Sequence, residues 1–572
     1  MRLNKLELRW IGKGENVKTE PRILIENKIL SNTTNDKNTE NVLIHGDNLL
    51  ALKALESKYT GQVKCIYIDP PYNTGNAFEH YDDGVEHSIW LNLMSKRLII
   101  LEKLLAQDGV IVVQLDKNEM AYGKVIMDEI FGRNNFITTV AVRMSATSGF
   151  KIEHSDKTIV KNVEFLHIYS KSLRLKPAYE KTDYDPHYSY ILGKNTNGIY
   201  EMNQLVQEPL VLQELEKYGL RKSAASLKQL YLISEVFKKF VSKNRNIIGR
   251  THTAPSAALK DSERLMNILP NRSSVVEFFD TKGERYYIKK TTNTLNQFIP
   301  ISLKFQIVDS YEGISEELSN ILGDWWDGFY LDMGNVENEG NVKFKASKKP
   351  ERLIYRILNM FTNPGDLVLD SFLGSGTTSA VAHKMNRRWI GIEMGEHAYT
   401  HCKQRMDSVI DGEQGGISKL LEWKGGGGYK FFELAPTLIK KDQFGQQIIN
   451  KEYNPDMLAS TIALHEGFKY LPSQELFWKQ SYSSEVSFLF VTTKHISEEY
   501  LELIFNQMGE DEFLLISCKS FDGGLDKKYK NITIKKIPKS ILENCEYDVD
   551  NYNLNIITPS DFTDSIDEEE YQ

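Results

Sequence analysis

The residues best suited to chemistry are Asp69-Pro70-Pro71-Tyr72, which directly follow a short apolar run at 63–68. This run is rich in β-branched and aromatic residues and is followed by turn formers, which predicts a buried strand that ends at a loop. Two consecutive prolines fix φ and remove two backbone donors, so the loop, which continues through 73–75, is rigid and rich in acceptors. The carboxylate of Asp69 and the carbonyl of Pro70 can each accept an N–H of a planar amino group, with the ring of Tyr72 against the base. The pattern predicts chemistry on an exocyclic amine, although a plain strand and Pro-Pro turn has the same residues.

A second candidate site lies far along the chain, where an apolar strand at 367–370 ends in Asp370. A loop with Gly374 and Gly376 follows, then a helix, then a strand at 389–393 that ends in Glu393. Glycines let a ligand approach the backbone, and a helix N-terminus favours a polar ligand there. Glu393 lies 23 residues after Asp370, about the spacing at which an acid binds a ribose diol. A dinucleotide site is disfavoured, because Ser379 stands where its third glycine belongs.

A third strand end carries Gly46-Asp47-Asn48, between an expected strand at 42–44 and an expected helix at 49–55. Asp47 or Asn48 is expected to cap that helix. A plain helix cap and a ligand contact are both open for Asp47.

Together these segments resemble a known family. Asp-Pro-Pro-Tyr at 69–72 is similar to the catalytic motif of S-adenosylmethionine-dependent DNA methyltransferases that act on N6 of adenine, and Phe372-x-Gly374-x-Gly376 resembles their cofactor loop. The order of catalytic loop, insertion and cofactor loop is that of the β class. Further segments look like the modification subunit of type III restriction-modification systems: Gly323-Asp324-Trp325-Trp326-Asp327, Asn338-Glu339-Gly340-Asn341, Lys348-Lys349-Pro350-Glu351, the stretch 423–431 and Ile534-Lys535-Lys536-Ile537-Pro538.

The resemblance implies a fold, a cofactor and a role for each matching residue. The implied fold is α/β: a Rossmann-like methyltransferase sheet with circularly permuted motif order, an inserted target-recognition domain and a small C-terminal α/β domain. Asp69, Pro70, Pro71 and Tyr72 would be catalytic. S-adenosyl-L-methionine would be bound by Asp47, Asp370, Phe372, Gly374, Gly376, Thr377 and Glu393, with Asp47 near its adenine ring, Asp370 near its amino group and Glu393 on its ribose.

The implied substrate is double-stranded DNA with the target adenine flipped out of the stack. The implied partners are a second copy of the chain, forming a homodimer, and a restriction (helicase-nuclease) subunit. A cytosine-N4 methyltransferase is the nearest alternative, although Ser more often replaces Asp69 there. A protein-glutamine methyltransferase would have Asn at 69 and would leave the basic insertion unexplained, and an inactive DNA-binding specificity subunit would not need every catalytic position filled.

The 572 residues are too many for a single core. Strand, helix and strand alternate up to residue 170 and again from 350, which predicts one parallel sheet with crossover helices, including helices at 88–106 and 118–131 and ending near Ile410. The expected division is an N-terminal arm and linker (1–40), the catalytic half (41–170), the target-recognition insertion (171–340), the cofactor half (341–412) and a C-terminal domain with an acidic tail (413–572).

Charge is unevenly distributed along the chain. The net charge is −8, but ten acids and no Lys or Arg lie in 542–572, so the rest of the chain carries +2. In 211–290, 16 Lys or Arg stand against 8 Asp or Glu, with aromatic residues between them. Such a pattern favours phosphate contact and base stacking, although a solvated charged face would look the same. The candidate DNA contacts are Arg221, Lys222, Arg245, Arg250 and Arg285.

Other classes of site find little support. The apolar runs are too short for a membrane span and the start lacks a signal peptide's apolar core, so a cytoplasmic location is expected. The four cysteines, Cys65, Cys402, Cys518 and Cys545, are too scattered for a disulfide framework or a zinc site. His397 and His401 have metal-ligand spacing, but no third ligand is evident, so they are expected to be helix-surface residues.

Overall fold

The computed structural model describes residues 7–14, 20, 22–72, 83–146, 159–172, 175–269, 274–291, 294–344, 348–441 and 447–537. Asn73, Thr74 and Gly75 of the expected catalytic loop, Cys545 and the acidic tail lie outside these ranges. The chain forms two units, Pro177–Gly323 and the remainder, which are described separately. Within the described ranges, no helix has the length and apolar character needed to cross a membrane.

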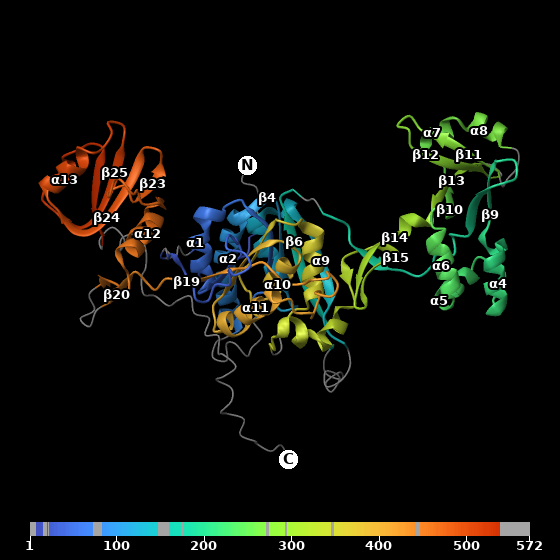
Figure 1. Ribbon diagram of the computed structural model, residues 1–572, viewed down its shortest axis with the longest axis horizontal. Helices are drawn as coiled ribbons and strands as arrows, with labels where there is room; N and C mark the ends of the chain where they lie inside the picture. Colours follow the sequence, from blue (N-terminus) through green and yellow to red (C-terminus); the bar gives the residue numbers. More distant parts are fainter. Residues whose placement is uncertain are drawn as a thin grey trace, which may run out of the picture. The chain divides into compact units, whose positions relative to one another are not determined.

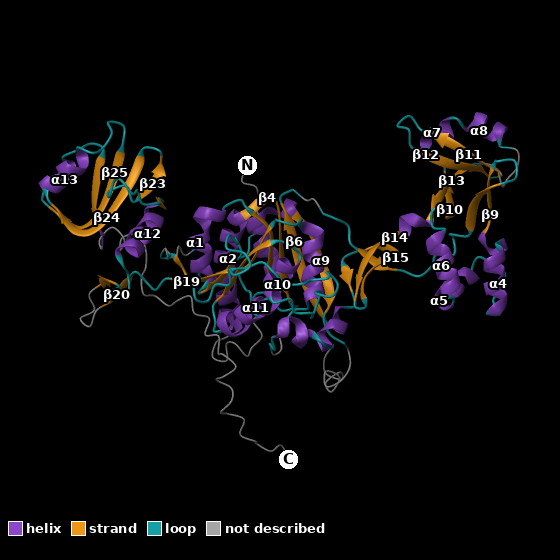
Figure 2. Cartoon of the chain, in the orientation of Figure 1, coloured by secondary structure: helices purple, strands orange, loops and turns teal. Residues whose placement is uncertain are grey.

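A ten-stranded sheet is the centre of the first unit (Figures 1 and 2). In spatial order its strands are β1 (Leu24–Glu26), β19 (Lys430–Leu434), β2 (Val42–His45), β18 (Arg388–Glu393), β17 (Leu367–Asp370), β3 (Val63–Ile68), β4 (Leu105–Leu115), β6 (Val163–Ser170), β5 (Phe136–Arg143) and β16 (Trp325–Trp326). The six strands from β19 to β4 are parallel, whereas β6 is antiparallel to both β4 and β5. The expected α/β sheet is therefore confirmed, with an antiparallel edge.

Helices cover both faces of this sheet. The helices α1 (Asn48–Tyr59), α2 (Asp83–Leu104) and α3 (Met120–Met127) pack in series, as do α9 (Glu351–Phe361), α10 (Thr377–Lys384) and α11 (Gln404–Ile410). Ile66 and Ile68 of β3 join one core cluster with residues of the first group, while the alternate residues Cys65 and Tyr67 are buried outside that cluster. Side chains alternate between the faces of a strand, so these two pairs serve opposite faces.

Most expected elements of this unit are present. The strands at 63–68 and 367–370 have the expected bounds, and α9 begins at Glu351, directly after the point where the alternation was expected to resume. The expected helix at 88–106 corresponds to α2, which begins earlier, at Asp83, and ends two residues sooner. Leu105 and Ala106 already belong to β4, and Leu105 pairs with Val63. The helix expected at 118–131 is an α-helix only over α3 and continues as a π-helix at Asp128–Gly132.

Three expected domain boundaries differ from the structure. β1, expected in an arm, pairs with β19, and β19, expected in the C-terminal domain, pairs in parallel with β2, so the sheet does not end near Ile410. The insertion is Pro177–Gly323 rather than 171–340, because β16 pairs with β5 of the central sheet. In each case a short strand far away in sequence supplies hydrogen bonds to an otherwise open edge.

The second unit is built around a closed six-stranded barrel of β10, β13, β12, β11, β9 and β8. Its strands are β8 (Tyr190–Lys194), β9 (Tyr200–Gln204), β10 (Ile248–Thr253), β11 (Ser274–Phe279), β12 (Arg285–Lys290) and β13 (Leu295–Pro300). Helices α4 (Pro209–Lys217), α5 (Ser226–Ile233) and α6 (Glu235–Lys243) interrupt the barrel strands, and α7 (Ser256–Lys260) and α8 (Ser262–Ile268) follow β10. A small sheet of β14 (Phe305–Ser310), β15 (Gly313–Ile321) and β7 (Tyr179–Lys181) completes the unit.

The C-terminal region contains a small α/β fold, as expected. Five strands pair in order: β22 (Lys469–Tyr470), β23 (Ser481–Ser484), β24 (Ser487–Ile496), β25 (Phe513–Phe521) and β26 (Ile532–Lys536). The helices α12 (Pro455–Glu466) and α13 (Glu498–Phe505) accompany them, after a hairpin of β20 (Ile439–Lys441) and β21 (Gln447–Ile449).

Candidate active site

The two predicted loops follow neighbouring strands and share one cavity. β3 and β17 pair in parallel, with Val368 opposite Cys65 and Leu369 opposite Ile66. In this register Asp370 falls opposite Tyr67 and Asp69 lies two residues further along, so both acids are at the carboxyl edge of the sheet, where open α/β sheets bind ligands. The cavity has a volume of about 350 Å³ and is lined by Tyr67, Asp69, Pro70, Pro71, Tyr72, Phe344, Lys349, Ile354, Asp370, Phe372, Leu373, Gly374, Ser375, Thr377 and Thr378.

Asp69 is held by two partners. Its Oδ1 accepts a hydrogen bond from the Tyr72 hydroxyl at 2.5 Å, and its Oδ2 lies 2.9 Å from the Lys349 ammonium. The Trp90 indole donates to the Pro71 carbonyl at 2.8 Å, which fixes the loop from α2. Each oxygen of a carboxylate can accept more than one bond, so Asp69 can still accept an N–H from a ligand.

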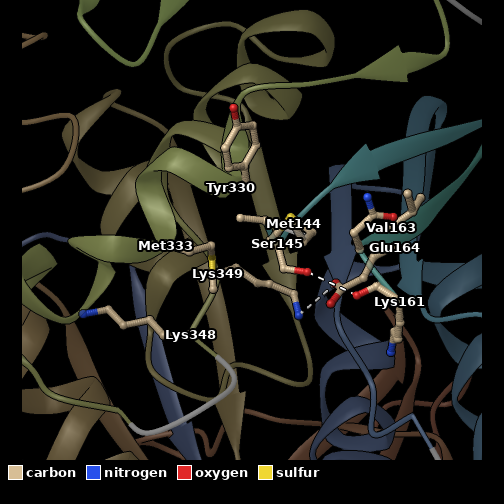
Figure 3. A pocket seen from close by; sticks show the side chains of 11 residues that line it. Met144, Ser145, Lys161, Val163, Glu164, Tyr330, Met333, Lys348 and Lys349 are labelled. Carbon is tan, nitrogen blue, oxygen red and sulfur yellow. Dashed lines mark hydrogen bonds and ion pairs between the residues drawn. The ribbon is translucent and has the colours of Figure 1, made fainter. Parts of the chain in front are cut away.

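A second carboxylate, Glu164 of β6, belongs to the same cluster. Its Oε2 lies 2.9 Å from the Tyr72 hydroxyl, 2.5 Å from Gln114 Nε2 and 3.3 Å from Lys349 Nζ. Figure 3 shows the Lys349 ammonium paired with the Glu164 carboxylate in the wall of a second cavity of about 330 Å³. Lys349 lines both cavities, so it lies where they meet.

Burial and mutual charge set the protonation of this cluster. Burial raises the pKa of Asp69, attraction to Lys349 opposes this and Glu164 adds to it, which leaves the pKa above its ordinary value. Burial also acts to raise the pKa of Glu164, but attraction to Lys349 and hydrogen bonds from Gln114, Tyr72 and Lys349 together leave that pKa below its ordinary value. Burial acts to lower the pKa of Lys349, and the two carboxylates reverse this, so the lysine stays charged.

Asp370 is buried at the start of the second loop. Its Oδ1 accepts the backbone N–H of Phe372 at 2.9 Å and its Oδ2 accepts the Thr378 hydroxyl at 2.6 Å. Burial raises the pKa of Asp370 to about 7, although both hydrogen bonds oppose the rise. The carboxyl group is therefore poised to change charge near neutral pH when a cationic group binds beside it.

The glycines of the second loop are there for backbone conformation. Gly374 and Gly376 have φ of 57° and 81°, in the left-handed region that favours glycine. A Cβ on Gly376 would also lie 3.3 Å from the Cα of Cys402. Glu393 does not line the cavity, but its Oε2 accepts the Gly374 N–H at 2.7 Å.

A buried ion network supports the same loop from behind. Arg405 donates to the Thr377 hydroxyl at 2.7 Å and to Glu351 Oε1 at 2.7 Å, and Lys384 donates to Glu351 Oε2 at 2.7 Å. Burial acts to raise the pKa of Glu351, but the two cations lower it to about 2, so the carboxylate stays charged. The network links α9, α10 and α11 under the loop.

Asp47 does not line the shared cavity. Its Oδ1 accepts the N–H groups of Leu49 and Leu50 at 2.9 and 3.1 Å, and its Oδ2 lies 3.3 Å from Arg97. The structure thus gives Asp47 the helix-cap role, and a cofactor contact remains a prediction.

The candidate DNA contacts all lie in the second unit but do not form one cluster. Arg221 and Lys222 are exposed in the turn between α4 and α5, while Arg245 precedes β10 and pairs with Glu316. Arg250 of β10 lies over the Tyr188 ring at 5.4 Å, and Arg285 of β12 pairs with Glu277 at 3.5 Å.

The expected histidine pair lies outside the cavity. His397 and His401 pack ring to ring at 4.9 Å, and both rings contact Phe344. Over the described ranges, no group of three or more His, Cys, Asp or Glu could hold a metal ion. Cys65, Cys402 and Cys518 are buried free thiols, as expected of core residues.

Sequence reasoning missed Glu164 and Lys349. Glu164 is a lone acid near the start of an apolar strand, and nothing in the local pattern separates it from a surface residue. Lys349 stands in the Lys-Lys-Pro-Glu segment that resembles the modification subunits, but no role was attached to it. The signal that would have found Glu164 is the strand order, which places β6 next to β4 at the same sheet edge. Lys349 lies before α9, outside any strand, so the strand order does not point to it.

The profile of a family described as "DNA methylase" matches residues 63–404, which include both loops and the insertion. The chain belongs to this DNA methylase family. The match begins at the first residue of β3 and ends at the first residue of α11.

Individual members resemble the chain over most of its length. It is 37% identical over 73% of its residues to the probable HindVI Mod subunit, a type III restriction-modification enzyme of Haemophilus influenzae, and 26% identical over 67% to the EcoPI Mod subunit of Escherichia phage P1. The chain spans 56% and 61% of those two relatives. Among solved structures, one described as the M1.HpyAVI-SAM complex aligns over 64% of this DNA methylase and 99% of the solved chain. The identity is 13% and the TM-score is 0.29, which is too weak a likeness to support a conclusion.

Proposed function

We propose that this DNA methylase is a site-specific, adenine-specific DNA methyltransferase that transfers a methyl group from S-adenosyl-L-methionine to N6 of a flipped-out adenine. One observation carries the proposal: the Asp69 loop and the Asp370 loop follow adjacent parallel strands and line one cavity. An acid that can accept an amino N–H and an acid that can accept a cationic amine thus face the same space. Family membership and the resemblance to Mod subunits support the reading.

The second loop suits S-adenosylmethionine in shape and charge. The cavity is at the small end of the range for small-molecule sites, about 300–1,000 Å³. Asp370 would take the amino group, the loop at Phe372, Gly374, Gly376 and Thr377 would hold the methionine end, and Glu393, which already bonds Gly374, would take the ribose. When bound, the cofactor supplies an electrophilic methyl group on a sulfonium.

The first loop suits the amine of a base. Asp69 and the Pro70 carbonyl would each accept one N–H of N6, which favours a pyramidal nitrogen whose lone pair points at the methyl group. Tyr72 would lie against the base ring. Lys349 lines the same cavity, and Glu164, which lines the second cavity, lies 2.9 Å from the Tyr72 hydroxyl. Orientation and electrostatic stabilisation would supply most of the rate enhancement.

DNA would be held in part by the second unit. Arg221, Lys222, Arg245, Arg250 and Arg285 would contact phosphate or base edges, and the resemblance supports a homodimer, a type III modification role, a restriction (helicase-nuclease) partner and a cytoplasmic location. We infer these from the basic excess and from the relatives described as Mod subunits.

A cytosine-N4 methyltransferase is the second candidate, because an exocyclic amine on cytosine needs the same acceptors. The Asp at position 69 favours adenine over cytosine. The test is to incubate the full chain with duplex DNA and methyl-labelled S-adenosylmethionine and then to digest the DNA to nucleosides. Label in N6-methyladenosine supports the proposal, label in N4-methylcytidine selects the second candidate, and unlabelled DNA rejects both.

A further inference from the structure

The catalytic centre contains two charged groups that the motifs do not account for. Lys349, from the segment before α9, places its Nζ 2.9 Å from Asp69 and 3.3 Å from Glu164. The side chains of all three residues are less than 20% exposed. The Tyr72 hydroxyl lies 2.5 Å from Asp69 Oδ1 and 2.9 Å from Glu164 Oε2, and it accepts a hydrogen bond from Lys349 Nζ at 3.0 Å. Four side chains from three segments therefore form one hydrogen-bonded set.

Other charged and titratable groups around this set come from every neighbouring element. Tyr67 of β3 donates to Gln114 of β4, which in turn donates to Glu164. Lys161 lies over the Tyr72 ring at 5.5 Å but pairs with Asp116 at 2.7 Å, so these two charges cancel. Asp370 faces the set from β17.

The set therefore carries surplus negative charge. Asp69 and Glu164 share a single ammonium, which leaves a net charge of −1 when both are ionised. In a buried site such a charge acts strongly on a nearby cation. The effect of this negative charge on the reaction therefore depends on the step at which positive charge develops nearby.

In the proposed reaction a cation appears on the base. The N6 lone pair forms the new N–C bond while the S–C bond breaks, so the positive charge moves from sulfur to nitrogen, and the nitrogen then releases a proton to Asp69 or to water. Negative charge beside N6 stabilises this product side. The negative charge of Glu164 also disfavours ionisation of Asp69, which must be a carboxylate to accept the N–H. The positive charge of Lys349 is needed to offset this repulsion.

We propose that Glu164 and Lys349 are positioning residues of the methyl-transfer centre: Lys349 orients the Asp69 carboxylate and keeps it charged, while Glu164 anchors Lys349 and Tyr72 and supplies negative charge beside the reacting amine. This inference rests on the proposed function. Glu164 and Lys349 also line the second cavity, with Ser145 and Tyr330 (Figure 3), so both are placed to face a base entering from that side.

Glu164 and Lys349 have opposite effects on the pKa of Asp69, so replacing each should shift the pH dependence of the rate in opposite directions. We would measure the single-turnover rate of methyl transfer against pH at saturating S-adenosylmethionine, so that cofactor affinity does not enter. In Glu164→Gln the charge that repels the Asp69 carboxylate is removed, so the acid limb of the pH–rate profile moves to lower pH by about one unit. The plateau rate falls by roughly tenfold, because negative charge beside the amine is lost. In Lys349→Met the attracting charge is gone, and the limb moves to higher pH by about one unit or more. Lys349→Arg keeps the charge and stays near wild type.

A matched control lies at the other end of β6. Asp128 accepts hydrogen bonds from Lys124 Nζ at 2.7 Å and from the Tyr169 hydroxyl at 2.8 Å, an equivalent acid, lysine and tyrosine set away from the cavity. Asp128→Asn should keep the wild-type limb and plateau. If Lys349→Met does not fold, Glu164→Gln and Lys349→Arg still test the sign.

The outcomes separate this inference from the proposed function. If the wild-type chain transfers no methyl group to DNA, the proposed function fails first. If wild type and Asp128→Asn are active and Asp69→Ala is not, but Glu164→Gln leaves the limb in place, the inference is overturned. Rates that fall in both variants with unmoved limbs would reduce the two residues to structural support and overturn it as well.

Discussion

The proposed methyl-transfer centre of the central sheet differs from the basic surface of the inserted unit, meaning its exposed Lys and Arg residues within 211–290, in how the residues are held. Asp69, Glu164 and Lys349 are mostly buried and bonded to one another across three segments. Arg285 and Lys222, each 57% exposed, pair only with acids of their own neighbourhood, Glu277 and Glu216. A buried set loses its geometry when one member is removed, whereas an exposed charge is screened and acts almost alone.

This difference orders the expected effects of substitution. Changes at the sheet edge should alter chemistry or cofactor binding by large factors and in a residue-specific way. Changes on the basic surface should be smaller and additive, because exposed ion pairs contribute little and distant sites are independent.

The largest effect is expected at Asp69. Asp69→Ala removes the acceptor for the amine, and losing such an oriented group costs about 3 kcal/mol or more, roughly a hundredfold in rate. Single-turnover methyl transfer should fall accordingly while calorimetric binding of S-adenosylmethionine is kept. Asp108→Ala is the control and should be active. Asp108 lies in β4 and pairs with Lys64 of β3, at the end of these strands away from the cavity. Near-normal turnover of Asp69→Ala would contradict the assignment.

The next effect is expected in the cofactor loop. Gly376 has φ of 81° and its Cβ would press on Cys402, so Gly376→Val should abolish S-adenosylmethionine binding in calorimetry. Gly365→Val is the control, matched to Gly376→Val for backbone strain, since Gly365 has φ of 86°. No atom lies within 4 Å of a Cβ at this position, which is in the turn before β17. A folded Gly376→Val with wild-type affinity would mean that the cofactor site is elsewhere.

A pH effect of intermediate size is expected at Asp370. Because its pKa is raised to about 7, the free protein carries a proton there below that pH, and a cationic amino group must displace it. Affinity for S-adenosylmethionine should therefore rise with pH, by about tenfold per unit, and level off near 7. Calorimetry in buffers of different ionisation enthalpy measures the released proton. Asp370→Asn should remove the dependence and Asp366→Asn should keep it; an unchanged slope in Asp370→Asn would assign the proton to another group.

The smallest effects are expected on the basic surface. If Arg285 touches phosphate, Arg285→Ala weakens binding to cognate and scrambled duplexes alike and flattens the salt dependence; a base contact would instead cost about 1 to 3 kcal/mol on the cognate site only. Arg388→Ala, an exposed arginine of the central sheet that pairs with Glu40, is the control. If Arg221, Lys222, Arg245, Arg250 and Arg285 can all be replaced without change, sequence choice lies outside the insertion.

The same difference explains what the sequence could and could not predict. β3 and β17 are short apolar runs that end in an acid and a turn, so local pattern alone identified both strands and Asp69 and Asp370. Glu164 reaches them through the strand order and Lys349 through the packing of the segment before α9, and local pattern encodes neither. β19 was missed because Lys430–Leu434 is a strand by virtue of its pairing with β2.

The barrel was missed for a related reason. Its closure pairs Ile248 with Ile191 across three helices and a long stretch of chain, and its strands are short and half polar. The excess of Lys and Arg in 211–290 identified a basic region, but composition gives no geometry. In the structure the five candidate contacts lie in the turn between α4 and α5, before and within β10, and in β12.

The most direct test of the account is to sequence DNA from cells that express this chain alone, with detection of modified bases, beside cells that express Asp69→Ala. The account predicts N6-methyladenine at one recurrent sequence in the first sample and none in the second. Unmodified DNA from the wild-type chain, or modification that survives in Asp69→Ala, would contradict the claim that the loops at Asp69 and Asp370 together form a methyl-transfer site.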